Sequence, residues 1–260
     1  MPKLTIIIVP GSFAPAYIYD SVVNPVKEQG YEIKALPIPT VGPRPGVTGP
    51  GTFTTMYDDA AFIAKEIEAL ADAGTEVVLV SHSYGGFPAT ESTKGLSVKE
   101  RQREGKKGGV VRLAYMTVLL GLPGQSPANV LEDVPSNETA KLIPDERGWV
   151  MTPAPHPTTI FSGMSEEEAA KLSKEFAPHS IISFTNPLTH AGYKDIPVSY
   201  LFCEGDQTIP PAVQRKEIDM IERETGSKVD VTSINSNHVP TVHCPEKVVD
   251  WLITCARKSE

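Results

Sequence analysis

The sequence is poor in cysteine, with only three among 260 residues: Cys203, Cys244 and Cys255. Three thiols are too few for a disulfide framework, and their spacing is not that of a metal site. A long hydrophobic run is also missing, because the apolar stretch after Lys3 is too short for a signal sequence or a membrane span. We therefore expect a cytoplasmic protein in a reducing compartment, with no membrane attachment and no metal.

An excess of positive charge is missing as well, since the formal net charge is −8 at pH 7. The phosphate backbone of nucleic acids demands a basic surface, so we expect no nucleic-acid partner. One basic stretch, 94–112, mixes its cations with glutamates and glycines, and we interpret it as solvated surface. The sequence has no phosphate-binding loop and no dinucleotide fingerprint, which predicts a protein that uses no cofactor. With nucleic acids and cofactors excluded, we expect the binding partner to be a small-molecule substrate.

What the sequence does contain is an alternation of apolar runs and helical patterns. The runs are nearly continuous and rich in Ile, Val and Leu, as in parallel strands that are covered on both faces. Among the helical patterns, 54–74 has a threonine cap, early acidic residues and Gly74 as a stop. This alternation predicts one α/β domain with a mostly parallel, doubly wound sheet. The expected strands are 3–9, 31–38, 76–82, 109–119, 197–203 and 228–234.

Two segments interrupt the alternation, and the chain's abundant proline, 24 residues, clusters in them. Residues 121–189 hold one clear helical pattern, opened by a Ser-x-x-Glu capping box. We predict that they form an inserted cap, while 1–120 and 190–260 form the core. The second segment, 37–51, is too long and too rich in Pro and Gly for an ordinary strand-to-helix connection. Both are expected at the surface as lids or rims, where binding residues concentrate.

The stretch "VVLVSHSYGGF" at 77–87 places Ser83 where a buried strand ends and a helix begins. This is the context of a nucleophile elbow, in which the serine sits on a strained turn. The residues two before and two after the serine must be small, so that strand and helix can approach each other. Gly85 meets this requirement fully, and Ser81 replaces the usual first glycine with another small residue. The pattern predicts that Ser83 is a nucleophile.

A serine hydroxyl needs a histidine to take its proton and an acid to orient that histidine. Where the serine stands on a nucleophile elbow, the three follow in the order Ser, acid, His. His238 follows the last expected strand and is favoured over His243, which stands at the entrance to the final helix. Asp206 lies just past the end of a strand and is favoured over Glu204, which falls within the strand terminus. The sequence thus predicts a Ser83, Asp206 and His238 triad.

Ester cleavage also needs donors for the oxyanion. One is expected to be the backbone N–H of Tyr84, which directly follows the nucleophile. The other is expected in the loop after the first strand, "VPGSFAPAY", where Gly11 lets the backbone turn. Either Ser12 or Phe13 supplies that N–H, and Ser12 is favoured.

With these residues in place, the chain resembles the α/β-hydrolase superfamily. Within it, the chain looks like the branch of plant methylesterases, hydroxynitrile lyases and related small bacterial and fungal hydrolases. The resemblance rests on "VLVSHSYGG", "CEGDQTIPPAVQ" and "SNHVPTVHCPEKVVDWL", and on "SFTNPLTHAGYKDIPVSYLF" where the cap returns to the core. It covers 3–120 and 160–256 and is weak over 121–159. The resemblance implies an α/β-hydrolase fold.

Departures from that branch bear on the reaction. Pro10 stands where the branch usually has a histidine, which alters the loop without removing its backbone N–H groups. Hydroxynitrile lyases of the branch have a threonine at the position of Gly11 and a lysine at that of Val239, which makes this chain esterase-like rather than lyase-like. Epoxide hydrolases and haloalkane dehalogenases use an aspartate where this chain has Ser83.

The expected function is a serine hydrolase that cleaves a small carboxylic ester, lactone or thioester through an acyl-enzyme. Two alternatives stay open on the same fold: a small-molecule receptor or carrier, and a biosynthetic enzyme for C–C cleavage, dehydration or cyclisation. The substrate is expected to be apolar or aromatic, because the candidate pocket residues are of that kind. Those candidates are Phe13, Tyr17, Tyr84, Leu119, Trp149, Met151 and Phe161.

Overall fold

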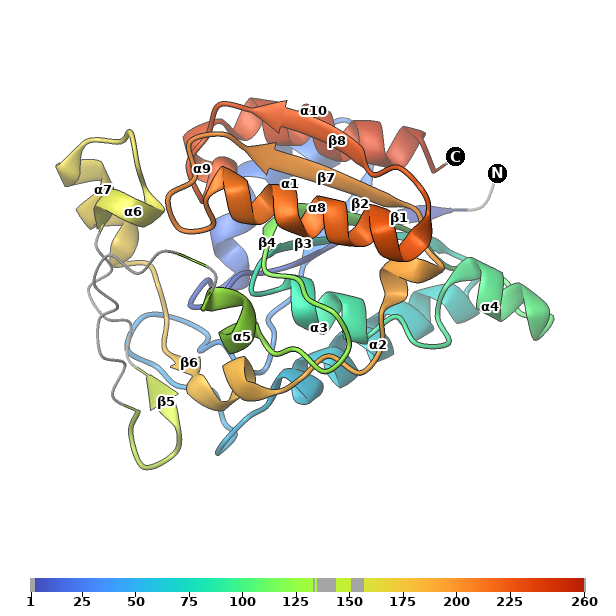
Figure 1. The fold of residues 1–260 in the computed structure, drawn as a ribbon, viewed down its shortest axis with the longest axis horizontal. Coiled ribbons are helices and arrows are strands. Elements are labelled where there is room, and N and C mark those ends of the chain that lie inside the picture. Colours follow the sequence, from blue (N-terminus) through green and yellow to red (C-terminus); the bar gives the residue numbers. More distant parts are fainter. Residues whose placement is uncertain (1–2, 133, 135–143, 151–156, 260) are drawn as a thin grey trace.

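A six-stranded parallel sheet forms the centre of the molecule in the computed structural model (Figure 1). The structure describes residues 3–132, 134, 144–150 and 157–259. Its order is β2-β1-β3-β4-β7-β8, and every neighbouring pair is parallel. The expected doubly wound sheet is confirmed. The strands are β1 (Leu4–Val9), β2 (Glu32–Ala35), β3 (Glu76–Ser83), β4 (Gly109–Val118), β7 (Val198–Cys203) and β8 (Asp230–Ile234).

Helices cover both faces of this sheet, which is why its strands are apolar on both sides. Along β1, Ile6 and Ile8 pack against α1 (Asp20–Glu28) and α10 (Pro245–Arg257), whereas Ile7 and Val9 belong to the opposite core. That core contains residues of α2 (Met56–Asp72), α3 (Gly86–Glu91) and α8 (Pro211–Thr225). Smaller elements at the rim are η1 (Ala16–Tyr19), α4 (Val98–Arg103) and α9 (Pro240–His243).

The chain between β4 and β7 adds short elements outside the main sheet. Figure 1 shows α6 and α7 beyond the tips of β7 and β8, where the carboxyl ends of the strands lie. Serine caps begin α5 and α7, and the capping box predicted for α7 is present as Ser165 with Glu168. These elements are α5 (Pro127–Leu131), β5 (Trp149–Val150), α6 (Pro157–Ile160), α7 (Glu166–Ser173), β6 (His179–Ser180), η2 (Ile181–Thr185) and η3 (Gly192–Lys194). The boundaries that we gave to the cap stay a prediction.

The proline-rich segment 37–51 is attached to this added part by hydrogen bonds. Arg147 donates from Nη2 to the carbonyl oxygens of Gly49 (2.7 Å) and Gly51 (2.9 Å), and Trp149 Nε1 donates to the latter at 2.9 Å. The Trp149 ring is fully buried against Gly49, where a Cβ atom would lie 2.6 Å from it. Trp149 therefore anchors two segments to each other. No helix in the described part of the chain is long and apolar enough to cross a membrane.

Candidate active site

Ser83 stands on a tight turn between β3 and α3, as the sequence predicts. Its φ is +52°, a left-handed conformation that costs a non-glycine residue about 1–3 kcal/mol. Gly85 is necessary here, because a Cβ atom would lie 2.5 Å from the carbonyl oxygen of Pro10. Gly86 is equally constrained, at 2.4 Å from that of Leu119. The close approach of neighbouring backbone thus explains both glycines of the motif.

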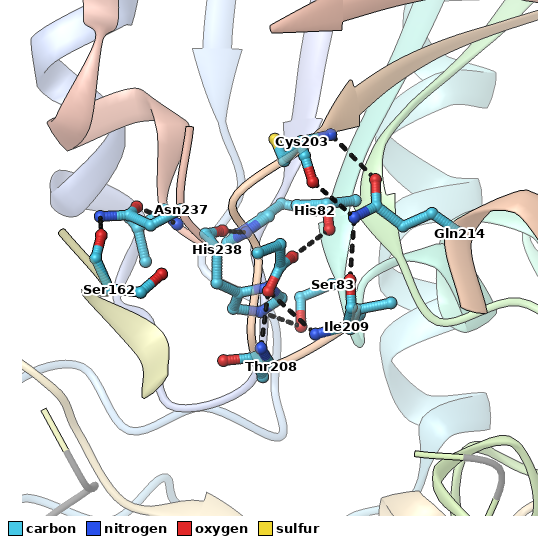
Figure 2. A network of polar contacts seen from close by, with 12 residues as sticks. His82, Ser83, Ser162, Cys203, Thr208, Ile209, Gln214, Asn237 and His238 are labelled. Atoms are coloured by element: carbon cyan, nitrogen blue, oxygen red, sulfur yellow. Dashed lines mark hydrogen bonds and ion pairs between the residues drawn. The ribbon is translucent and has the colours of Figure 1, made fainter. Parts of the chain in front are cut away.

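The structure brings His238 and Asp206 to this serine. His238 Nε2 lies 2.9 Å from Ser83 Oγ, and His238 Nδ1 lies 2.7 Å from Asp206 Oδ2. Figure 2 shows the imidazole of His238 facing the Ser83 hydroxyl. Ser83 ends β3, and Asp206 and His238 lie in the loops after β7 and β8, so the three meet at the carboxyl edge of the sheet. Their side chains are almost fully buried, which strengthens the electrostatic coupling among them.

Asp206 is prepared to carry a negative charge. Its oxygens accept hydrogen bonds from the N–H groups of Thr208 (2.7 Å) and Ile209 (2.9 Å) and from the hydroxyl of Thr117. Burial raises the pKa of this carboxyl, but the neighbouring His238 and the hydrogen bonds outweigh it, so the pKa lies below its usual range. An ionised Asp206 selects the tautomer of His238 that has its proton on Nδ1, which leaves Nε2 free to accept the serine proton.

Gln214 of α8 holds the loop that carries Asp206. Its Nε2 donates to the carbonyl oxygens of Cys203 (2.9 Å) and Ile209 (2.8 Å), and its Oε1 accepts from the Cys203 N–H (2.9 Å). Figure 2 shows the amide of Gln214 between these two backbone segments. A fully buried glutamine with these partners fixes the loop on both sides of the acid.

The two alternatives from the sequence lie elsewhere. His243 is exposed at the end of α9, where its Nδ1 lies 3.1 Å from Ser236 Oγ. Glu204 is exposed as well and accepts a hydrogen bond from Ser233 Oγ at 2.6 Å. Neither side chain contacts Ser83 in the described part of the chain.

A buried chain of hydrogen bonds joins three parts of the site. The N–H of Gly11 donates to Tyr19 Oη (2.9 Å), Tyr19 Oη lies 2.7 Å from His82 Nδ1, and His82 Nε2 lies 2.7 Å from the carbonyl oxygen of His238. A carbonyl only accepts, so His82 has its proton on Nε2 and accepts from the Tyr19 hydroxyl at Nδ1. Burial, together with the smaller effect of the nearby His238, lowers the pKa of His82 to about 3, so His82 is neutral.

The loop after β1 leaves one N–H free for an oxyanion. Gly11 uses its N–H on Tyr19, and Phe13, at φ +62°, donates to His179 Nδ1 at 3.4 Å. Among the described residues, no acceptor reaches the N–H of Ser12 or that of Tyr84. The geometry therefore favours Ser12 over Phe13 as the second oxyanion donor.

The side chain of Tyr84 turns away from the pocket. Its hydroxyl donates to Asp59 Oδ2 at 2.9 Å, and Asp59 also accepts from the N–H (2.9 Å) and the hydroxyl (2.6 Å) of Thr40. Burial raises the pKa of Asp59 to about 7, although the hydrogen bonds from Thr40 and Tyr84 act in the opposite direction. Tyr84 thus offers the site its backbone only, which corrects its place among the pocket candidates.

An apolar cavity of about 240 Å³, the catalytic pocket, opens beside Ser83 and His238. Phe13 and Leu119 line it, as expected from the sequence. A separate surface cleft of about 390 Å³, with Arg215 and Glu217 in its walls, includes no member of the triad. The lining of the catalytic pocket also includes residues that the sequence did not indicate: Ala14, Ile18, Tyr19, His82, Leu131, Ile160, Phe176, Phe184, Thr208, Ile209 and Val239.

Three other candidates do not line the catalytic pocket. Trp149 is fully buried against segment 37–51, and Tyr17 and Phe161 line a neighbouring cavity. The physical reason is that the packing of the segments that carry these residues decides which cavity they line, and aromatic composition does not reveal that packing. Met151 lies outside the described residues. Thr208, Ile209 and Val239 had a usable signal, because each lies within three residues of Asp206 or His238.

Comparison with known proteins places the chain in a family. The sequence model that describes the alpha/beta hydrolase family matches residues 6–251 of this chain. The chain is also 34% identical over 257 residues to "Probable hydrolase R7" of Phoma sp. (strain ATCC 20986 / MF5453), covering 98% of this chain and 99% of that protein. The chain therefore belongs to the alpha/beta hydrolase family, and the resemblance to that superfamily is confirmed.

Solved structures show the same fold. Polyneuridine aldehyde esterase superimposes with a TM-score of 0.73 at 17% identity, covering 98% of this chain and 99% of that one. Tomato Methylketone Synthase I, complexed with 2-tridecanone, gives a TM-score of 0.72 at 15% identity and covers both chains fully, at 100%. At these identities the likeness concerns the fold.

Proposed function

We propose that this α/β-hydrolase is a serine esterase that cleaves a small apolar or aromatic carboxylic ester, lactone or thioester through an acyl-enzyme. The observation that carries the proposal is the pair of contacts at His238, 2.9 Å to Ser83 Oγ and 2.7 Å to Asp206 Oδ2. A hydroxyl, an imidazole and a carboxylate in this sequence of contacts are the parts of an activated serine nucleophile.

In the proposed mechanism, Ser83 Oγ attacks the carbonyl carbon while His238 Nε2 takes the hydroxyl proton. The N–H groups of Ser12 and Tyr84 hold the oxyanion. When the tetrahedral intermediate collapses, His238 returns the proton to the leaving alcohol or thiol and the acyl group stays on Ser83. Water then attacks the acyl-enzyme, with His238 again as the base, and the carboxylic acid leaves. Asp206 orients the imidazole throughout and stabilises its cationic form.

The catalytic pocket supports this substrate class, because it is lined mainly by apolar side chains such as Phe13, Leu119 and Phe184. The protein complexed with 2-tridecanone has the same fold and binds an uncharged molecule with a long alkyl chain. We also keep the cytoplasmic location as a prediction, which the free and buried thiols Cys203, Cys244 and Cys255 support.

Labelling with a fluorophosphonate, followed by peptide mass spectrometry, tests the proposal. We expect modification of Ser83 in the wild type and in the His243→Ala variant, and none in the His238→Ala variant. No labelling of the folded wild type would refute a serine hydrolase. A wild type that binds apolar esters without cleaving them, with the same affinity in the Ser83→Ala variant, would instead indicate a receptor or carrier.

A further inference from the structure

A second apolar cavity, of about 220 Å³, lies next to the catalytic pocket, and we call it the side cavity. Ile18, Phe176 and Val239 line both cavities, so the two cavities adjoin at these three residues. An apolar cavity of about 150 Å³ in another protein is known to hold benzene, so the side cavity has room for an aromatic ring or a folded alkyl chain. The proposed reaction gives the side cavity no role.

The far side of the cavity consists of Phe161, Leu172 and Val242, from the neighbourhoods of α6, α7 and α9. These side chains belong to a small apolar cluster, separate from the two cores of the sheet, in which Phe161 stacks on Phe176 with ring centroids 5.9 Å apart. The cavity therefore exists because the added segment packs onto the loop that carries His238.

Val239 is held in place relative to His238. It directly follows that histidine, and its N–H donates to Asn237 Oδ1 at 3.0 Å. The amide of Asn237 donates from Nδ2 to the carbonyl oxygen of Ser162 at 3.2 Å, and Figure 2 shows Asn237 directed at Ser162. Asn237 is almost fully buried, so one side chain ties Val239 to the added segment.

We propose that the side cavity binds the alcohol arm of the ester, and that this arm is a long alkyl chain or an aromatic ring without negative charge. The inference rests on the proposed function. His238 must return its proton to the leaving oxygen, so the alcohol half of the substrate lies on the side of His238. Val239 continues the chain from that histidine, and the side cavity lies behind Val239.

The charge requirement comes from the rim of the side cavity. Glu175 lines the cavity and accepts a hydrogen bond from Tyr17 Oη at 3.3 Å, while both residues remain exposed. An arm that ends in a carboxylate meets the carboxylate of Glu175, whereas an uncharged arm is bounded by apolar side chains. The proposal therefore predicts selectivity at the end of the arm as well as for its length.

Two esters that differ by one methylene and have the long arm on opposite sides of the ester group give a direct test: decyl acetate has it on the alcohol, and methyl decanoate on the acyl group. Leu172→Trp fills the side cavity without lining the catalytic pocket. Burial of one methylene changes affinity about fourfold, so losing the last few methylenes of the arm is a large effect. We expect Leu172→Trp to lower kcat/KM for decyl acetate at least tenfold and for methyl decanoate less than threefold, measured by acid release in a pH-stat.

Leu131→Trp is the matched control, because Leu131 lines only the catalytic pocket. It is expected to affect both esters, without the selective loss on decyl acetate. Thermal melts establish that each variant is folded, and Leu172→Ala, which enlarges the side cavity, serves if Leu172→Trp does not fold. That variant should favour dodecyl acetate over decyl acetate relative to the wild type. Equal losses on decyl acetate and methyl decanoate would overturn the proposal.

A binding measurement separates this proposal from the reaction itself. In Ser83→Ala protein, titration calorimetry with the same two esters should show that adding Leu172→Trp weakens decyl acetate at least tenfold and methyl decanoate less than threefold. If the wild type cleaves neither ester, this binding difference alone decides the side cavity, while the proposed function is decided by fluorophosphonate labelling of Ser83. The acetate ester whose decyl arm ends in a carboxylate, 10-acetoxydecanoate, should bind at least tenfold more weakly than decyl acetate. Glu175→Gln should reduce that difference in affinity. An unchanged difference would refute the charge requirement.

Discussion

Tyr19→Phe tests whether the buried chain from Gly11 through His82 to His238 holds the site together. The substitution removes only the hydroxyl oxygen and keeps a ring that is almost fully buried. It leaves two buried groups without a partner, the N–H of Gly11 and Nδ1 of His82. Each such group costs about 1–3 kcal/mol, so the free energy of unfolding should fall by about 2–6 kcal/mol.

The same substitution should also slow the reaction of Ser83 with a fluorophosphonate. Without Tyr19 Oη, the loop that carries the Ser12 N–H is no longer tied to His82, and His82 holds the backbone of His238. We expect the labelling rate to fall about tenfold or more, because small displacements of catalytic groups have large effects on rate.

Urea unfolding and labelling rates of the same preparations provide the assay. Tyr57→Phe is the control: its hydroxyl also makes a hydrogen bond, to the carbonyl oxygen of Pro187 at 2.6 Å, but Tyr57 is exposed. That variant should stay within about 0.5 kcal/mol of the wild type. A Tyr19→Phe protein within about 1 kcal/mol of the wild type, with an unchanged labelling rate, would refute the reasoning.

Four further predictions concern neighbouring residues. Asp206→Asn should lower kcat by about 10⁴ with little change in KM, because the imidazole loses its correct tautomer; steady-state kinetics with a small ester that show less than a tenfold loss would exclude Asp206 as the orienting acid. Thr117→Val should lower kcat about tenfold, and Thr117→Ser, which keeps the donor to Asp206, should restore it; a variant pair with equal kcat would argue against that role. Ser81→Ala should raise the free energy of unfolding by about 1 kcal/mol, because the buried Ser81 hydroxyl has no partner among the described residues, and a clear loss in urea unfolding would contradict this. Asp59 has a pKa of about 7 in the folded protein against an ordinary value of 3.8, so unfolding releases a proton between about pH 4 and 7 and the wild type loses stability as the pH rises through that window. The free energy of unfolding of Asp59→Asn should therefore rise relative to that of the wild type, by up to about 4 kcal/mol at pH 7. A difference between the two proteins that stays constant with pH would refute the shift.

The sheet was predictable because its information is local. Each strand is a short apolar run bounded by turn residues, and all six expected runs contain a strand at about the expected limits. The positions of Ser83, Asp206 and His238 after three of these strands were predictable for the same reason. Once parallel strands are aligned, the residues that follow them meet at one edge, whatever their separation along the chain.

Contacts across the sheet gave no local signal. Thr117 lies 89 residues from Asp206, and Tyr19 lies 63 residues from His82, so no spacing pattern could have connected them. The aromatic residues of the cap show the same limit. Trp149 and Phe161 are large aromatic residues of the kind that line binding pockets. The packing of their segment decides that Trp149 anchors segment 37–51 and that Phe161 lines the side cavity.

Left-handed backbone is concentrated at this site. Of the four non-glycine residues with positive φ in the described part of the chain, Phe13 lies in the loop after β1, Ser83 at the elbow and Thr117 at the contact with Asp206. Ser83→Gly therefore relieves about 1–3 kcal/mol while it removes the proposed nucleophile. A duplicated copy of this chain that is released from hydrolysis gains folding stability by that single change. In this chain, the loss of the proposed nucleophile by that change is therefore downhill in folding free energy, and its return requires the strain to be rebuilt.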